Sequence, residues 1–212
     1  VDLSEFGATT GDSDATITIS TTDEAGNANS TNVLVKFDTT VPAWTESNTE
    51  HKFLVDKKAF ASGNWYKASS LEVTGCYEEA GSGVKLVYYW IQTPGESAPT
   101  TTDVTSANGS FTPTAGTGIA YFTTTLGSFE VSTVDSNGTI TPNKLYLVAV
   151  DQVGNASSAQ TFEINLDTES PSLQSNMSGE VYTNKVADIT VSGTCSDNAS
   201  GVASISLTIG EN

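Results

Sequence analysis

One five-residue motif occurs twice in this chain of 212 residues, and its spacing constrains the fold more than any other feature. The motif Asp-x-x-Gly-Asn begins at Asp23 and again at Asp151. After each copy an alternating segment leads into Asp-Thr-x-x-Pro, which starts at Asp38 and at Asp167. An internal repeat on this scale indicates an array of similar units.

Apolar side chains alternate with polar ones on both sides of each motif copy. Ile17 and Ile19 precede the first copy, and Val33, Val35 and Phe37 follow it. A period of two on both sides of a glycine-containing turn predicts a β-hairpin. Gly, Ser, Thr and Asn are abundant and no window has a helical period, so we expect short strands and many turns throughout.

The repeat divides the chain into three parts. Residues 42–168 are predicted to be a complete unit, residues 1–41 the C-terminal part of the unit before it, and residues 169–212 the N-terminal part of the unit after it. Within the complete unit, Val84 to Ile91 is the most strand-like segment, and its Tyr88 and Trp90 are expected to face the core. We expect an excerpt of a longer array. The alternative is a subunit whose partial ends complement those of neighbouring subunits in a filament.

The two motifs, together with Ser82-Gly83-Val84 and its counterpart Ser200-Gly201-Val202, resemble the bacterial Ig-like repeats found in tandem in large surface and secreted proteins. This resemblance implies an all-β fold: an Ig-like β-sandwich, with one complete central domain flanked by two partial repeats. It also implies an extracellular or cell-surface location and a mechanical role as stalk, spacer or fibre. The central unit departs from the third by carrying Glu78-Glu79 where the third has Ser196-Asp197.

A net charge of −17 limits the partners that this chain can have. Nucleic acid and anionic lipid both require basic patches, so neither is expected to bind. No stretch of about twenty apolar residues is present, so we expect no membrane insertion. The expected partners are neighbouring Ig-like repeats or identical subunits, and a host or surface ligand is left undefined.

The Asp-x-x-Gly-Asn motif has two interpretations. In the first it is a turn in which Asp accepts hydrogen bonds from the turn's own N–H groups. In the second it contributes oxygen ligands to Ca²⁺, which needs six to eight of them, at a junction where Asp151 and Asn155 approach linker or next-unit oxygens. The turn is the preferred interpretation, and the resemblance adds calcium as the alternative, because some related arrays use calcium to stiffen their junctions. The candidate ligands are Asp23, Asn27, Asp38, Asp151, Asn155, Asp167, Glu169 and Asp197.

We expect no enzyme, no catalytic residue and no bound organic cofactor. The single histidine, His51, stands in a polar insertion, and adjacent strand residues such as Glu78 and Glu79 point to opposite faces. Trp65 and Tyr66 have two interpretations, either strand packing or a sugar-binding surface. The second keeps open an adhesin or carbohydrate-binding module, and an accessory domain of a secreted enzyme is a further alternative.

The two cysteines are not expected to form a disulfide. The repeat alignment places Cys76 and Cys195 one position apart in equivalent strands of different units, so their side chains should face opposite sides.

Overall fold

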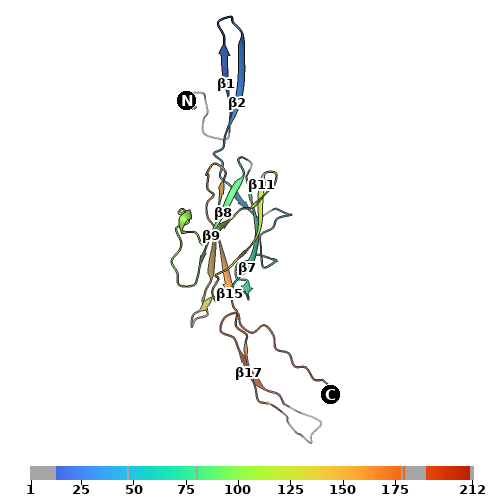
Figure 1. Ribbon diagram of the computed structural model, residues 1–212. Coiled ribbons are helices and arrows are strands. Elements are labelled where there is room, and N and C mark those ends of the chain that lie inside the picture. The colour runs from blue at the N-terminus through green and yellow to red at the C-terminus, as the bar shows by residue number, and fades with distance from the viewer. Residues whose placement is uncertain (1–12, 47, 80, 178, 180–189, 211–212) are drawn as a thin grey trace.

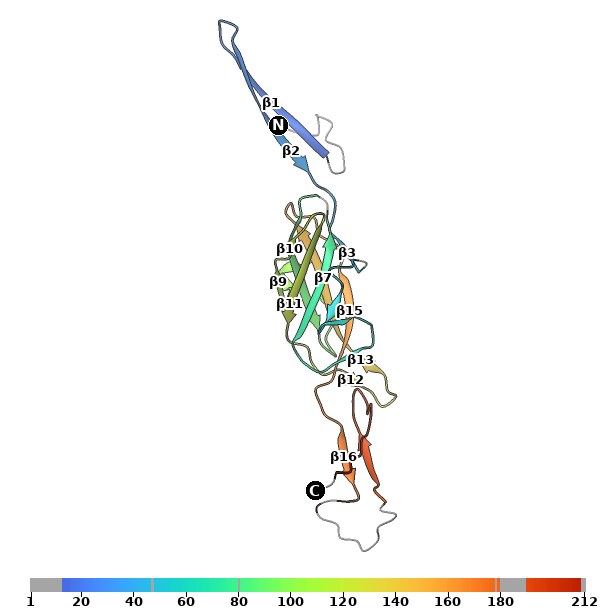
Figure 2. The ribbon, with the colours of Figure 1, turned by 90° about the vertical axis from the view of Figure 1, so that its right-hand side faces the viewer.

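The computed structural model describes residues 13–46, 48–79, 81–177, 179 and 190–210. These residues form an elongated all-β molecule with a hairpin at one end, a broad body in the middle and a small two-stranded sheet at the other end (Figure 1). The hairpin consists of β1 (Ser13–Thr22) and β2 (Ala28–Phe37). The sheet at the far end consists of β16 (Ser172–Ser175) and β17 (Gly193–Ser196). Figure 2 shows that both lie beyond the ends of the body.

One sheet of the central body is built around β7 (Leu71–Glu78). Its strands pair in the order β10-β11-β7-β4-β5, and β3 pairs with the other end of β7. All of these pairings are antiparallel. The remaining strands are β3 (Ala43–Thr45), β4 (Leu54–Val55), β5 (Lys58–Ala59), β10 (Thr114–Ala115) and β11 (Ile119–Leu126).

The second sheet has the order β6-β15-β14-β8-β9. Its pairings are antiparallel except between β15 and β6, which run parallel. The strands are β6 (Trp65–Tyr66), β8 (Val84–Gln92), β9 (Gly109–Phe111), β14 (Asn143–Asp151) and β15 (Gln160–Leu166). A short hairpin of β12 (Thr133–Val134) and β13 (Ile140–Thr141) and a 3₁₀ turn, η2 (Val104–Ser106), complete the body.

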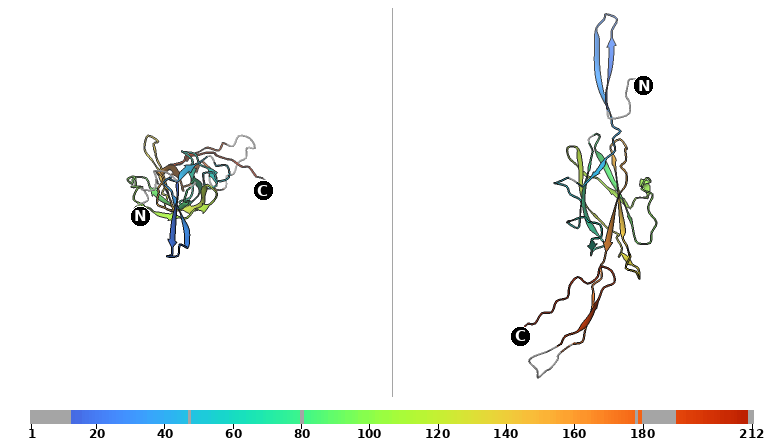
Figure 3. Two further views of the ribbon diagram at one scale, coloured as in Figure 1. Left: turned by 90° about the horizontal axis from the view of Figure 1, so that it is seen from above. Right: turned by 180° about the vertical axis from the view of Figure 1, so that it is seen from behind.

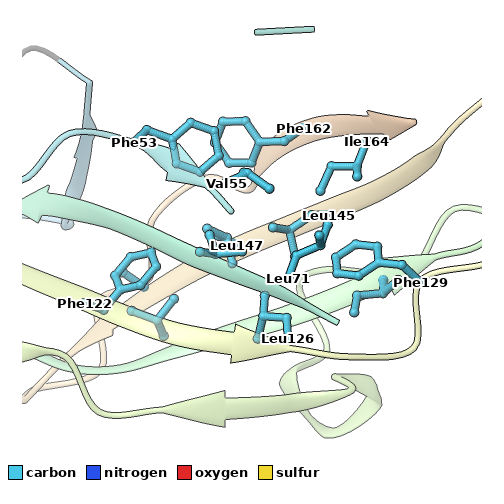
Figure 4. Packing of buried hydrophobic residues seen from close by; sticks show 14 of the residues in the cluster. Phe53, Val55, Leu71, Phe122, Leu126, Phe129, Leu145, Leu147, Phe162 and Ile164 are labelled. Carbon is cyan, nitrogen blue, oxygen red and sulfur yellow. The ribbon is translucent and has the colours of Figure 1, made fainter. Parts of the chain in front are cut away.

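The core lies between these two sheets (Figure 4). Leu71 and Val73 point into it from one sheet, and Leu145 and Leu147 from the other, and all four are fully buried. Trp44 closes one end with edge-on ring contacts, such as the 5.1 Å centroid distance to Phe53. Burying each large apolar side chain contributes about 1.5–3 kcal/mol, so this alternation holds the two sheets face to face as a β-sandwich.

The sequence predicted that Tyr88 and Trp90 of β8 face the core, but the alternate residues of the strand do so instead. Val87 and Ile91 belong to the core cluster, whereas Trp90 is buried on the opposite face. The loop containing η2 covers that face, and the indole N–H of Trp90 donates to Ser106 Oγ at 3.2 Å. Because β8 is covered on both sides, its sequence is apolar at nearly every position and gives no clear alternation.

The two end sheets repeat the strand registers of the body. In the hairpin Ile17 pairs with Val33, and in the body Leu145 pairs with Phe162. The repeat aligns Ile17 with Leu145 and Val33 with Phe162, so the two pairs are equivalent. Likewise Ser172 pairs with Ser196 as Ala43 pairs with Glu78.

Within the described residues, neither end sheet has an opposing layer (Figure 3). Apolar side chains are therefore exposed here: 58% for Ile19, whose counterpart Leu147 is fully buried in the body, and 68% for Leu173.

Candidate functional site

The Asp-x-x-Gly-Asn turn of the body is organised around a buried carboxylate. Asp151 is fully buried, and its Oδ1 accepts hydrogen bonds from the backbone N–H groups of Val153, Gly154 and Asn155 at 2.7–3.0 Å. Its Oδ2 accepts from Asn155 Nδ2 at 2.7 Å. Gly154 has φ of +104°, a conformation that glycine adopts without strain. The turn therefore satisfies its own aspartate.

The first copy of the motif has the same internal bonds but a different environment. The backbone N–H and the side-chain amide of Asn27 each donate to the Asp23 carboxylate at 2.8 Å. These hydrogen bonds from Asn27 lower the pKa of Asp23, although the residue is exposed at the hairpin tip. The motif therefore forms a similar turn at the exposed hairpin tip and in the buried setting of the body.

The linker before the body is held by its aspartate. The backbone N–H of Ser82 donates to Asp38 Oδ2 at 2.5 Å, and that of Thr40 donates to Oδ1 at 3.1 Å. Asn155 Nδ2 also donates to the backbone oxygen of Asp38 at 3.0 Å. A side chain on Gly81 would place its Cβ 2.5 Å from the Asp38 carboxylate, so the approach depends on glycine. Asp38 thus joins the linker to two loops of the body.

The linker after the body makes the same contact to the third unit. The backbone N–H of Ser200 donates to Asp167 Oδ2 at 3.0 Å, and that of Glu169 donates to Oδ1 at 2.9 Å. Asp167 aligns with Asp38, and Ser200 aligns with Ser82. Hydrogen bonding from Ser200 is the main cause that lowers the pKa of Asp167. We call Asp38–Ser82 and Asp167–Ser200 the two junction contacts.

A second acid supports the loop at each junction contact. Glu79 Oε1 accepts from the backbone N–H of Gly81 at 2.6 Å, and Asp197 Oδ1 accepts from that of Ala199 at 3.1 Å and that of Gly201 at 2.8 Å. The replacement of Asp197 by Glu79 in the body therefore keeps the same kind of bond. Glu79, Ser82 and Ser200 were not among the site residues expected from the sequence, although the alignment of the two loops contained them.

The eight predicted calcium ligands lie in three separate groups. Asp23 and Asn27 are at the hairpin tip. Asp151 and Asn155 lie beside Asp38. The third group is Asp167, Glu169 and Asp197 at the other junction, which the sequence had led us to expect beside Asp151 and Asn155. The reason for the separation is β15, whose seven residues carry the chain roughly 23 Å from the turn to the opposite pole of the body.

The structure does not bring these candidate ligands together around one point within the described residues. Among the residues described, no three Asp, Glu, His or Cys side chains are grouped so that they could hold a metal ion. Apart from Glu169, each candidate carboxylate already accepts hydrogen bonds from backbone N–H groups. Calcium binding therefore stays a prediction.

The other candidates from the sequence have ordinary packing roles. His51 stacks on Tyr121 with ring centroids 3.8 Å apart. Tyr66 is buried in the core, whereas Trp65 is half-buried and lines a pocket at the second junction. Cys76 is buried in the body, Cys195 is half-buried in the third unit, and both are free thiols.

No model of a known protein family matches the chain, and no curated protein matches it. Over the described ranges, no helix is long and apolar enough to cross a membrane.

Proposed function

We propose that this chain is part of an extracellular bacterial Ig-like repeat array with a mechanical role as stalk, spacer or fibre. The observation that carries the proposal is the repeated junction contact. At both linkers, an aspartate carboxylate accepts the backbone N–H of the equivalent serine in the following unit. A contact that recurs at successive linkers sets a constant relation between neighbouring units, which is what a rod requires.

The strand order of the body supports the Ig-like assignment. Ig-type sandwiches pair strands A, B, E and D in one sheet and G, F and C in the other. The order β3-β7-β11-β10 in one sheet and β15-β14-β8 in the other corresponds to this pattern. On this assignment β6, parallel to β15, is the second segment of a first strand that changes sheets.

The linkers themselves favour stiffness. Pro42 and Pro171 follow the junction aspartates by four residues, and each fixes its own φ and restricts the residue before it. With the aspartate also bonded to the next unit, few freely rotating bonds remain between units. This stiffening uses only the chain's own hydrogen bonds and requires no ion.

Small-angle X-ray scattering of the chain tests the proposal. Asp38→Ala combined with Asp167→Ala removes both junction contacts, and Glu24→Ala combined with Glu50→Ala is a control with the same change in charge at exposed positions. We expect a shorter mean dimension and a broader distance distribution for the first pair only. Scattering curves that superimpose for the two variants would refute the mechanical role of the contacts. Melting curves in millimolar calcium and in chelator separately test the calcium prediction.

A second candidate function is self-assembly by complementation of the partial ends. It is favoured by the matching registers and by the uncovered apolar faces of β1–β2 and β16–β17 within the described residues. The β1–β2 hairpin is equivalent to β14–β15 of the body. In a neighbouring subunit it would supply the layer that the β16–β17 sheet lacks. Size-exclusion chromatography of the chain distinguishes the candidates, because a monomer at all concentrations excludes a filament.

A further inference from the structure

An apolar groove of about 320 Å³ lies on the third unit, over β16, β17 and the segment 205–207. Its apolar lining comes from five side chains: Leu173, Val191, Cys195, Ile205 and Leu207. The four large ones are strongly exposed, from 49% for Val191 to 71% for Ile205. The part of the chain that the structure describes therefore leaves this groove uncovered.

The groove corresponds to one half of the core of the body. Leu173 pairs with Cys195 in the third unit, and the equivalent residues Trp44 and Tyr77 pair in the body. The repeat alignment matches the other lining residues to positions of the body: Val191 to Val73, Ile205 to Val87 and Leu207 to Tyr89. In the body all five counterparts belong to the core cluster or pack against it. The groove is therefore a half-core whose opposing half is absent among the described residues.

In the body, β14 and β15 supply the opposing half of the core. Leu145 and Leu147 of β14 are fully buried there. Their equivalents are Ile17 and Ile19 of β1, in a hairpin that has the same register as β14–β15. This hairpin lies beyond the opposite end of the body (Figure 2), so it cannot cover the groove of its own chain. A hairpin of this kind that reaches the groove must come from a second copy.

The segment beside the groove also lacks a strand partner. Residues 201–210 pair with no strand among the described residues, although they align with the region of β8. In the body β8 pairs with β14, and Tyr89 lies opposite Leu147. The same register would place Leu207 opposite Ile19 of a second copy. An unpaired strand edge next to an apolar groove is the arrangement that binds an added strand, because main-chain hydrogen bonds form along the edge while side chains enter the groove.

We propose that the groove of the third unit binds the β1–β2 hairpin of a second copy of this chain, in the register in which β14–β15 occupies the body. β1 adds to the segment 201–210 as a strand, and Ile17 and Ile19 fill the groove. Hairpin and groove lie at opposite ends of the chain, so the contact is heterologous and each bound copy offers a new groove. This inference rests on the self-assembly candidate described above and defines its partner and its register.

The turn of the hairpin has a docking position in this register. In the body, Asn155 Nδ2 donates to the backbone oxygen of Asp38 at 3.0 Å and so ties the turn to the linker. The equivalent bond joins Asn27 of the second copy to the backbone oxygen of Asp167. The linker at Asp38 of the second copy then leaves the completed unit in the way that the linker at Asp167 leaves the body. Complete bodies and completed units therefore alternate along one array.

Sedimentation velocity over a range of concentrations tests the proposal. About 0.15 M salt screens the repulsion between copies that each carry a net charge of −17. We expect wild-type chains to form species whose size grows with concentration. Ile19→Asp places a charge in the groove and should weaken the association about tenfold or more. Thr18→Asp is the matched control, because this exposed neighbour lies on the other face of β1 and the change in charge is the same.

A mixing experiment shows that the two elements bind each other. Val191→Asp alters the groove and leaves the hairpin intact, whereas Ile19→Asp alters the hairpin and leaves the groove intact. Each variant alone should associate weakly, and an equimolar mixture should form a dimer and nothing larger, because one intact hairpin and one intact groove remain. A dimer also shows that both variants keep their intact element folded.

The outcomes separate this inference from the proposed function. A wild-type chain that is monomeric at every concentration overturns both the inference and the self-assembly candidate. If the wild type associates but Ile19→Asp behaves like Thr18→Asp, or the mixture gives no dimer, the register is wrong while self-assembly stands. The mechanical role is decided by the scattering of the junction variants, which leave hairpin and groove unchanged.

Discussion

Replacing Asp151 by asparagine tests how much the buried turn stabilises the body. The substitution keeps the shape of the side chain but replaces one oxygen by an amide NH₂. If the remaining oxygen faces the three backbone N–H groups, the NH₂ points at Asn155 Nδ2, which is also a donor. Asn155 cannot turn its amide over without losing its 3.0 Å bond to the backbone oxygen of Asp38. One hydrogen bond must therefore be lost.

The size of the effect follows from these contacts. A hydrogen bond to a charged group contributes about 1.5–3 kcal/mol, and the three backbone bonds weaken when the acceptor becomes neutral. Removing a buried charge offsets part of this loss. We expect the free energy of unfolding to fall by about 2–3 kcal/mol. For a unit of this size that corresponds to a melting temperature lower by roughly 10 °C.

Tryptophan fluorescence is the suitable assay, because Trp44, Trp65 and Trp90 all lie in the body. The matched control is Asp135→Asn, which changes an exposed aspartate that also accepts turn N–H groups in the same unit. We expect the control to melt close to the wild type. If both variants melt at the same temperature, the buried network does not stabilise the body as argued.

Three further predictions concern other parts of the chain. A Gly75→Ala variant should destabilise the body by about 1–3 kcal/mol in fluorescence-monitored melting, because the added Cβ would overlap the Trp44 ring. Gly127→Ala is the control, because its Cβ would meet nothing and Gly127, like Gly75, does not have a positive φ. Burial raises the pKa of the Cys76 thiol, so a thiol reagent should label half-buried Cys195 first and Cys76 only on unfolding; equal labelling rates would contradict this. Hydrogen bonding, first of all from Ser200, lowers the pKa of Asp167 in the folded chain. The second junction contact therefore stabilises the fold fully above the unfolded pKa of about 3.9, and this stabilisation is lost as the pH falls through the lower folded pKa. Scattering at pH 7 and at a pH well below about 3.9 should show the difference, and Asp167→Ala should not respond in the same way.

Local features of the fold could be predicted from the sequence. The alternation around Ile17 and Val33 predicted a hairpin, and the structure pairs these two residues directly. The Asn137-Gly138 pair after Val134 is typical of a hairpin turn, and Gly138 has the positive φ that such a turn requires. These features depend on neighbours in sequence, so the residues themselves carry the information.

Contacts between distant segments were harder to predict. Both faces of β8 are covered, so the parity of Trp90 could not be read from alternation. The partner of Asp38 is a backbone N–H 44 residues later, and any residue except proline offers that donor. The position of Asp151 relative to Asp167 could have been derived, because a seven-residue strand separates opposite poles of a sandwich.

The parallel pairing of β6 with β15 determines how the body resists tension. Pulling on residues 42 and 168 in opposite directions would load β3 against β7 first, and tension that passes on to β6 would act lengthwise along its pairing with β15. The bonds beside the exit strand, such as Asp167 N–H to the Tyr66 oxygen at 2.9 Å and Ser132 N–H to the Leu166 oxygen at 2.8 Å, are then loaded together. When strands are pulled apart perpendicular to their length, their hydrogen bonds break one at a time. In shear along the strands several hydrogen bonds must break together, which raises the force that the body withstands.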